Sequence, residues 1–383
     1  MKIPRFFFSA GITFAALGIT GSGFAQAATK PFVPSPEALK RAAGSSGIDP
    51  AGDGGITRHP GGFDRPQAPE SLPGNGLKEH DFFAAGVHSS RDGKGIVMVR
   101  NGQVAWNFYN PTVTGNYYDG TMMANGNLLL AHARGVMVIA PDKSILWRYE
   151  VKPIEHEIDG VQPVGTDRVV FLRNGNPSPH ILVANITTGK IEKDITLPLA
   201  GESHMKEATY VHMQARRLRL TPQGTAVIAY TNADKVAEYD EHGKEVWSAP
   251  VRQPWSVERL KNGNTLVASV NMNTIEMNTK GETVWTLTPA DLAAQGYIID
   301  KLQAAMRLPN GNTIVTVNNE TAWRPGMTPD EWAPVQAIEV SPDKKIVWAL
   351  RSWTGDTNLG PATTIQFLDD PNIHKLFGFG TLH

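Results

Sequence analysis

The residue types best suited to catalysis gather in one stretch, residues 210–219 (YVHMQARRLR). If this stretch is a β-strand, its alternation places His212, Gln214 and Arg216 on one face. That face would direct a base, an amide and a guanidinium into one space. The alternative is a hydrogen-bonded strand end that carries solvated arginines.

Other polar and aromatic residues stand just before or within apolar runs and have no counterpart in the other runs. They are His88, Tyr117, Tyr118, Asp119, His156, Gln162, Trp255, Glu258, Gln303 and Gln366. Such positions are typical of residues around the mouth of a central channel, where a small-molecule or glycan ligand would bind. Part of the set can instead be structural and satisfy backbone groups around the axis.

Histidine, tyrosine and arginine, in a chain without cysteine, suit β-elimination from a uronic-acid glycan. An arginine or glutamine neutralises the carboxylate, one histidine or tyrosine removes the adjacent proton, and another protonates the leaving oxygen. The expected catalytic residues are His212, Tyr210, Arg216 and His156. The expected ligand-binding residues are Gln214, Gln162, Trp255, Glu258, His88 and Tyr118.

Two other functions stay open. The same donors suit a sulfate or another anion, which leaves sulfotransfer as an alternative. A third interpretation is a non-catalytic periplasmic binding or assembly scaffold, with a protein partner on segments 196–211, 288–302 and 319–334. Convergence of His212, Arg216 and a second histidine on one cavity would favour the enzyme. Trp255, Trp323 and Trp332 would then stack on sugar faces, unless they serve in packing.

We expect no cofactor and no metal site. The histidines near 156 and between 204 and 212 lack the H-E-x-x-H spacing of a zinc helix. A histidine triplet assembled from separate parts of the chain stays open.

A sequence motif recurs along the chain, and the elements that it forms must position these residues. It consists of an apolar run, a turn and a second apolar run that ends in Trp106, Trp147, Trp247, Trp285 or Trp348, with Lys193 at that place in a sixth copy. A second phrase, RL-x-NGN, begins at Arg259 and Arg307, and MANGN at 123–127 is close to it. Repeats of about 40–60 residues made of short strands and tight turns predict a radial array of sheets.

The fold predicted from these phrases is an all-β β-propeller of four-stranded blades. Six blades account for the copies, and a seventh stays open if another segment hides a sheet. The first copy lacks an inner strand, so residues 362–368 are expected to supply it and close the ring. Residues that recur in register, namely the tryptophans and Arg219, Arg259 and Arg307, are expected to serve the repeat.

These phrases carry a resemblance to known families. AEYDEHGKEVW resembles the repeats of quinoprotein-like propellers, and L-x-NGN-T-L is similar to repeats of bacterial arylsulfotransferase-type propellers. Together they resemble secreted bacterial propeller proteins, some of which are polysaccharide lyases. Quinoprotein dehydrogenases imply eight blades, a calcium-bound quinone and often a vicinal disulfide, and this chain of 383 residues has no cysteine. No sulfotransferase site residue can be matched.

The N-terminus predicts export. Residues 1–27 combine Lys2 and Arg5, an apolar run and the sequence Ala25-Gln26-Ala27, which is typical of a cleaved signal peptide. A periplasmic or secreted location follows, with no membrane span after cleavage. Residues 28–76 form a segment rich in proline and glycine, expected as a tether or strap, and residues 77–383 form the propeller.

The formal charge of the chain is close to neutral. Its 36 Lys and Arg residues nearly balance 37 Asp and Glu. Nucleic acid is therefore not expected as a partner, and neither is an anionic membrane.

Overall fold

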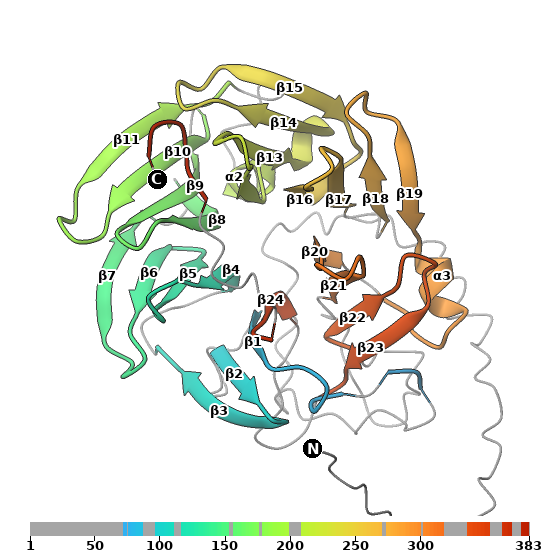
Figure 1. The fold of residues 1–383 in the computed structure, drawn as a ribbon. Coiled ribbons are helices and arrows are strands. Elements are labelled where there is room, and N and C mark those ends of the chain that lie inside the picture. Colours follow the sequence, from blue (N-terminus) through green and yellow to red (C-terminus); the bar gives the residue numbers. More distant parts are fainter. Residues whose placement is uncertain are drawn as a thin grey trace, which may run out of the picture. The chain divides into compact units, whose positions relative to one another are not determined.

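The chain forms a ring of six four-stranded antiparallel sheets, as predicted (Figure 1). The structure is a computed structural model. It describes residues 72–74, 76–86, 96–110, 116–152, 156–175, 178–198, 208–269, 273–299, 302–317, 335–352, 362–369 and 377–382. The predicted signal peptide, most of the proline-rich segment, His88, Trp323 and Trp332 lie outside these residues.

Each blade runs outward from an inner strand at the channel. In the first three blades, from the inner strand outward, the strands are β24 (Ala362–Phe367), β1 (Phe82–Gly86), β2 (Ile96–Arg100) and β3 (Gln103–Phe108); β4 (Tyr117–Met122), β5 (Leu128–His132), β6 (Gly135–Ile139) and β7 (Ile145–Glu150); β8 (His156–Val164), β9 (Arg168–Gly175), β10 (His180–Asn185) and β11 (Ile191–Thr196).

The other three blades follow the same plan. Their strands are β12 (Leu218–Leu220), β13 (Ala226–Tyr230), β14 (Lys235–Tyr239) and β15 (Glu245–Pro250); β16 (Pro254–Arg259), β17 (Thr265–Ser269), β18 (Thr274–Met277) and β19 (Thr283–Leu287); β20 (Leu302–Arg307), β21 (Thr313–Val317), β22 (Ala337–Val340) and β23 (Ile346–Leu350).

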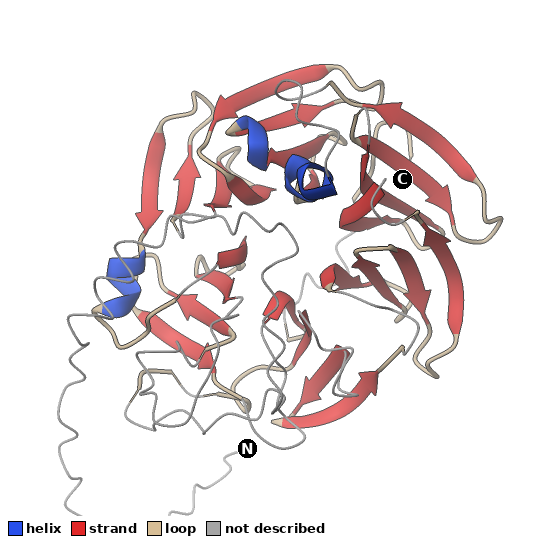
Figure 2. Cartoon of the chain, turned by 180° about the vertical axis from the view of Figure 1, so that it is seen from behind, coloured by secondary structure: helices blue, strands red, loops and turns tan. Residues whose placement is uncertain are grey.

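Helical segments are short, as the view from behind shows (Figure 2). In the described part of the chain they are α2 (Ala208–Gln214), the 3-10 turn η1 (Thr231–Ala233) and α3 (Pro289–Ala293). Among the described residues, no helix is both long and apolar enough to cross a membrane.

The ring closes through the C-terminal strand. β24 pairs antiparallel with β1, and Phe82 lies opposite Phe367. The first blade therefore contains strands from both ends of the propeller sequence, which confirms the expected closure. The C-terminal strand thus supplies the inner strand that the first blade would otherwise lack.

The turn between the third and fourth strands explains the recurring phrase. The turn of the first blade has two residues with positive φ, Asn101 (φ 50°) and Gly102 (φ 75°), and each of the other turns has one, for example Gly243 (φ 78°) and Gly281 (φ 83°). In the two Asp-Lys copies this position is taken by Lys143 (φ 73°) and Lys344 (φ 67°). The strand pairing shifts by one residue beside the turn, so the turn and the bulge form one unit.

The recurring tryptophans join neighbouring blades, as predicted. The indole N–H groups of Trp106, Trp247 and Trp285 donate to the carbonyls of Pro141, Thr279 and Pro342, respectively, in the next blade. Where the third blade has Lys193 in place of tryptophan, its ammonium forms an ion pair with Glu241 of the fourth blade.

Two of the recurring arginines strengthen the same joints. Arg259 pairs with Glu238 of the preceding blade, and its guanidinium lies 4.2 Å from the centre of the Trp247 ring. Arg307 repeats this arrangement with Glu276 at 2.8 Å and Trp285 at 5.4 Å. The prediction that these arginines serve the repeat is confirmed for Arg259 and Arg307.

The segment just before the first blade lies on the sixth blade. Leu72 is buried in a core cluster with residues of the fifth and sixth blades. The indole of Trp348 donates to the carbonyl of Gly76 at 2.6 Å, and Arg351 donates to the carbonyl of Gly74 at 2.6 Å. These residues therefore act as a strap over this part of the ring.

At the joint between the sixth and first blades, a histidine replaces the arginine. His80 Nε2 lies 3.1 Å from Glu339 and Nδ1 lies 2.9 Å from Asp369. Its ring stacks on Phe367 at 4.0 Å and meets the edge of Trp348 at 5.3 Å. Burial lowers the pKa of His80, but the hydrogen bonds and charges of the two carboxylates outweigh burial and raise it above 6.5.

We therefore expect the stability of the ring to fall as the pH rises through this raised pKa. The charged imidazole stabilises the fold fully below the unfolded-state pKa, and the contribution disappears once the folded histidine loses its proton. In thermal unfolding by circular dichroism, the stability difference between wild type and His80→Gln should shrink from about pH 6 to pH 8. The exposed His242→Gln is the control and should show no such change. A stability difference that does not vary with pH would contradict the stabilising role of the charged His80 between Glu339 and Asp369.

Candidate functional site

The inner strands run in the same direction around the channel. Ser256 and Glu258 of β16 accept from the backbone amides of Ala305 and Arg307 of β20, in the same order along both strands. The channel therefore has one end where all inner strands begin and one where they all end.

A β-bulge recurs near the start of the inner strands. The pairing of β4, β8, β16, β20 and β24 with the next strand shifts by one residue. The residues left without a partner in the ladder are Tyr118, Asp159, Trp255, Gln303 and Thr363. Bulges re-aim side chains and concentrate beside functional sites. The bulge recurs near the start of these five inner strands, whereas the side chain at the bulged position differs from blade to blade.

In the fourth blade, the structure corrects the sequence prediction. Residues 208–214 form helix α2, and the inner strand β12 is only Leu218–Leu220. The segment is too short for a period of two to be told from a period of 3.6, and its Ala, Met and Gln favour helix. His212 and Arg216 still meet, because the guanidinium of Arg216, two residues beyond the end of α2, turns back to the last helical turn and donates to the carbonyl of His212.

Gln214 does not join them, contrary to the expectation from strand alternation. Its amide bonds to the backbone of Gly175 on β9, accepting at 3.1 Å and donating at 3.3 Å. Gln214 therefore fastens α2 to the third blade and has a structural role.

His212 and Arg216 contact two carboxylates of β8. His212 Nδ1 lies 2.8 Å from Glu157 Oε1, and Arg216 Nη1 lies 2.5 Å from Asp159 Oδ1. Arg216 Nη1 also donates to the carbonyl of His212 at 2.8 Å, which caps the last turn of α2. Arg216 Nη1 also lies 3.2 Å from His212 Nδ1.

Two aromatic rings enclose the guanidinium. The Arg216 carbon Cζ lies 4.2 Å from the centre of the Trp255 ring and 4.9 Å from that of Tyr118. Trp255 is held in turn by a hydrogen bond from its indole to Gln303 Oε1 at 2.7 Å. We call Tyr118, Glu157, Asp159, His212, Arg216 and Trp255 the strand-start cluster.

The two carboxyl groups of the cluster have opposite pKa shifts. Burial raises the pKa of Glu157, but the charges of His212 and Arg216 and the hydrogen bonds from His212 and Tyr118 outweigh it and lower the pKa overall. For Asp159, burial dominates, and with the charge of Glu157 it raises the pKa well above 3.8 despite Arg216. Neighbouring carboxyls with divergent pKa values are typical of acid–base sites.

Tyr118 keeps its proton. Burial, followed by the charge of Glu157, raises the pKa of its hydroxyl well above 10. The phenol hydrogen bonds with Glu157 and is therefore a proton donor within the cluster.

The structure assembles only part of the predicted catalytic set. His212 and Arg216 meet, whereas the partner of His212 is Glu157 and not its neighbour His156. Strand alternation explains this, because Glu157 and Asp159 share the face opposite His156. The E-x-D spacing before the third inner run was the signal that could have revealed both acids. The structure does not describe the side chain of Tyr210.

The predicted ligand contacts divide between the two channel ends. Tyr118 and Trp255 belong to the strand-start cluster, and Tyr117 is buried in the core. Gln162, Glu258 and Gln366 lie at the other end, where their side chains accept from the backbone amides of Leu220, Arg307 and Met122, respectively. These hydrogen bonds join neighbouring inner strands.

A buried salt bridge crosses the channel between the two ends. Asp119 of the second blade accepts from Arg219 of the fourth at 2.6 and 2.9 Å and pairs with Arg217. Arg217 also donates to the carbonyl of Thr363 in the first blade at 3.2 Å. The prediction that Arg219 serves the repeat is therefore wrong, because no glutamate stands on β10 to receive it. We call Asp119, Arg217 and Arg219 the transverse strut.

Within the described part of the chain, no group of three metal-ligating side chains comes together.

Comparisons with known proteins find a likeness in structure but none in sequence. No family model matches the sequence, and no curated protein matches it either. A protein of unknown function from Bacteroides caccae is similar in structure, with a TM-score of 0.60, 17% identity and coverage of 76% of this chain and 99% of that chain.

Two lyase structures are more distant. A streptogramin B lyase gives a TM-score of 0.47 with 15% identity, and covers 74% of this chain and 88% of its own. A catalytically inactive virginiamycin B lyase from Staphylococcus aureus with quinupristin gives 0.48 with 11% identity, and covers 73% and 88%. At such identities the likeness concerns the fold alone: the chain is a six-bladed β-propeller.

Proposed function

We propose that the strand-start cluster catalyses β-elimination from a uronic-acid glycan. The observation that carries this proposal is the hydrogen bond of 2.8 Å between His212 Nδ1 and Glu157 Oε1. For the neutral form of His212 we assign the proton to Nδ1, from which the Glu157 carboxylate accepts a hydrogen bond. The neutral imidazole then has its lone pair on Nε2.

Nε2 of His212 is positioned to act as the base. No described residue forms a hydrogen bond with it, and 13% of the side chain is exposed. In the proposed step, Nε2 removes the proton next to the uronate carboxylate, and the carbon–oxygen bond to the leaving sugar breaks as the double bond forms. Tyr118 donates its proton to the leaving oxygen. The atoms balance without a co-reactant.

Arg216 supports this step through its charge. Removal of the proton shifts negative charge onto the substrate carboxylate, and a nearby guanidinium in a low-dielectric site stabilises that charge. Only 4% of its side chain is exposed, so we assign Arg216 electrostatic stabilisation and assign the half-buried Trp255 the contact with the sugar face.

We also propose that the protein works outside the cytoplasm, on the strength of the signal-like residues 1–27. A polyuronic substrate agrees with that location.

The test is an assay of the purified protein against a panel of polyuronic glycans. Elimination creates an unsaturated uronate that absorbs in the ultraviolet, and the product masses sum to that of the substrate with no added water. We expect rising absorbance on at least one glycan. Flat absorbance across the panel would overturn the proposal and favour the binding scaffold, and products that carry added water would indicate hydrolysis.

A further inference from the structure

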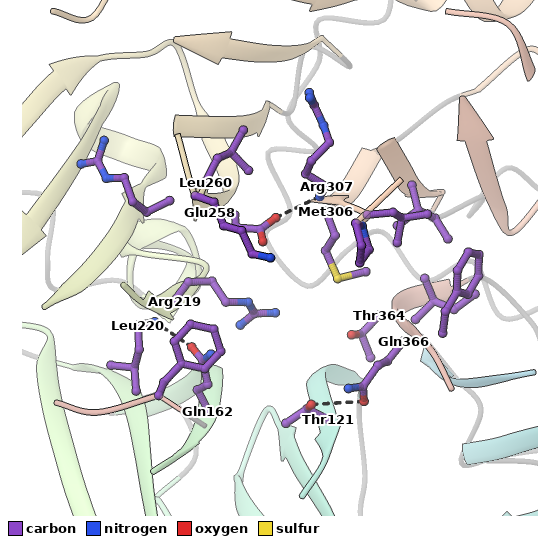
Figure 3. Close-up of a pocket in the computed structure, with 18 of the residues that line it drawn as sticks. Thr121, Gln162, Arg219, Leu220, Glu258, Leu260, Met306, Arg307, Thr364 and Gln366 are labelled. Carbon is purple, nitrogen blue, oxygen red and sulfur yellow. Dashed lines mark hydrogen bonds between the residues drawn. The ribbon is translucent and has the colours of Figure 1, made fainter. Parts of the chain in front are cut away.

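The end of the channel where the inner strands finish holds a cavity of about 460 Å³, lined by residues of all six inner strands (Figure 3). We call it the strand-end cavity. Its volume is within the range of small-molecule sites, about 300–1,000 Å³. The transverse strut separates it from the strand-start cluster, so it is a different site.

Apolar side chains form most of its walls. They are Met122, Leu260, Met306, Leu308, Ile365 and Phe377. Phe377 comes from the C-terminal segment, which is anchored beside the cavity by the fully buried Phe379 and by the bond from the Gly380 amide to the Gly224 carbonyl at 2.8 Å. An apolar ligand body of moderate size therefore fits against these walls.

One arginine of the lining points into the cavity. Arg259 and Arg307 are turned toward Glu238 and Glu276, whereas the guanidinium of Arg219 faces the open space (Figure 3). Arg219 shares Asp119 with Arg217, and the charge of Glu258 in the lining also acts on it. The guanidinium of Arg219 is the charged donor that the strut presents to this cavity.

Gln162 adds a donor beside Arg219. Its Oε1 accepts from the Leu220 amide at 2.7 Å, which fixes the orientation of the side chain and leaves the NH₂ group as donor. No described residue accepts a hydrogen bond from that NH₂ group. A guanidinium and an amide NH₂ side by side suit a carboxylate, which only accepts.

Glu258 limits the charge of the ligand. It is the one acidic residue of the lining, and its carboxylate accepts from the Arg307 amide at 3.0 Å. It would repel a second anionic group. We propose that the strand-end cavity binds a monocarboxylic acid with an apolar body, with its carboxylate at Arg219 and Gln162.

The test compares three probes by isothermal titration calorimetry on the full chain. Phenylbutyrate should bind with saturation, and its neutral amide, phenylbutyramide, should bind about tenfold or more weakly because it loses the charged hydrogen bonds. Suberate, with a carboxylate at both ends, should also bind more weakly. Equal binding of acid and amide, tighter binding of suberate, or no binding of phenylbutyrate would overturn the proposal.

A matched variant locates the site. Gln162→Glu keeps the acceptor for the Leu220 amide but replaces the NH₂ donor with a negative oxygen, and it should abolish phenylbutyrate binding. His212→Ala, in the separate cluster, should bind the probe as wild type does. Unchanged binding by Gln162→Glu would contradict the assignment. If that variant does not fold, the acid–amide comparison on wild type decides, and its outcome is independent of the glycan reaction.

Discussion

Replacing Asp119 with alanine should lower the free energy of unfolding by about 3–5 kcal/mol, the range for breaking a buried ion pair. The side chain is 1% exposed and receives hydrogen bonds or ion pairs from Arg217, Arg219 and the amides of Gly120 and Val161. Its removal leaves two buried guanidinium groups with no carboxylate between them. Because Asp119 joins three blades, the loss should destabilise the whole ring.

The pKa of Asp119 adds a second expectation. Burial raises it, but the two arginines outweigh burial and hold it below 3.8. The stabilisation is therefore present above the unfolded-state pKa and is lost as the pH falls through the folded-state value.

Urea unfolding followed by tryptophan fluorescence measures the effect. Asp343→Ala is the matched control, because its carboxylate is 60% exposed and pairs with Lys345 on the surface at 3.0 Å. Surface pairs contribute about 0–1 kcal/mol. If Asp119→Ala costs no more than Asp343→Ala, the strut does not hold the blades together.

Replacing His212 with alanine should reduce kcat/KM for the polyuronic substrate about a thousandfold, since a positioned general base contributes roughly 10²–10⁴. The proposal places the proton acceptor on Nε2 of this residue alone. Glu157→Gln should give a smaller loss, because the amide oxygen still accepts from Nδ1 but no longer stabilises the imidazolium that forms.

The control for this prediction is His180→Ala on the third blade. His180 also contacts a carboxylate, Asp194 at 2.5 Å, but it lies far from the channel on the strand β10. It should keep wild-type activity. If His212→Ala remains as active as His180→Ala, the base is another residue and the assignment fails.

Most of the fold could be predicted because residues with known local structural preferences recur in each repeat. Turn residues such as Gly243 and Lys344 mark the hairpins, and tryptophans mark five of the six outer strands. The closing role of residues 362–368 followed from counting strands. The role of His80 could not be predicted. In space His80 takes the place of the arginines at the other joints, but in the sequence it precedes β1, whereas Arg259 and Arg307 end inner strands.

The site was harder to predict because it depends on departures from the repeat. The α2 segment alternates polar and apolar residues over only a few positions, which a strand and a helix satisfy equally. The bulges that aim Tyr118, Asp159 and Trp255 are offsets of one residue in pairing. No residue type signals such an offset, and one position decides whether His156 or Glu157 meets His212.

The structure of His212→Ala with a bound oligouronate tests the central claim most directly. The variant keeps Glu157, Arg216 and Trp255 but lacks the base, so the substrate should remain intact. We predict a sugar ring against Trp255 and a glycosidic oxygen near Tyr118, with the acidic carbon facing the space vacated by the imidazole. An oligouronate bound only in the strand-end cavity, or away from the channel, would contradict the account.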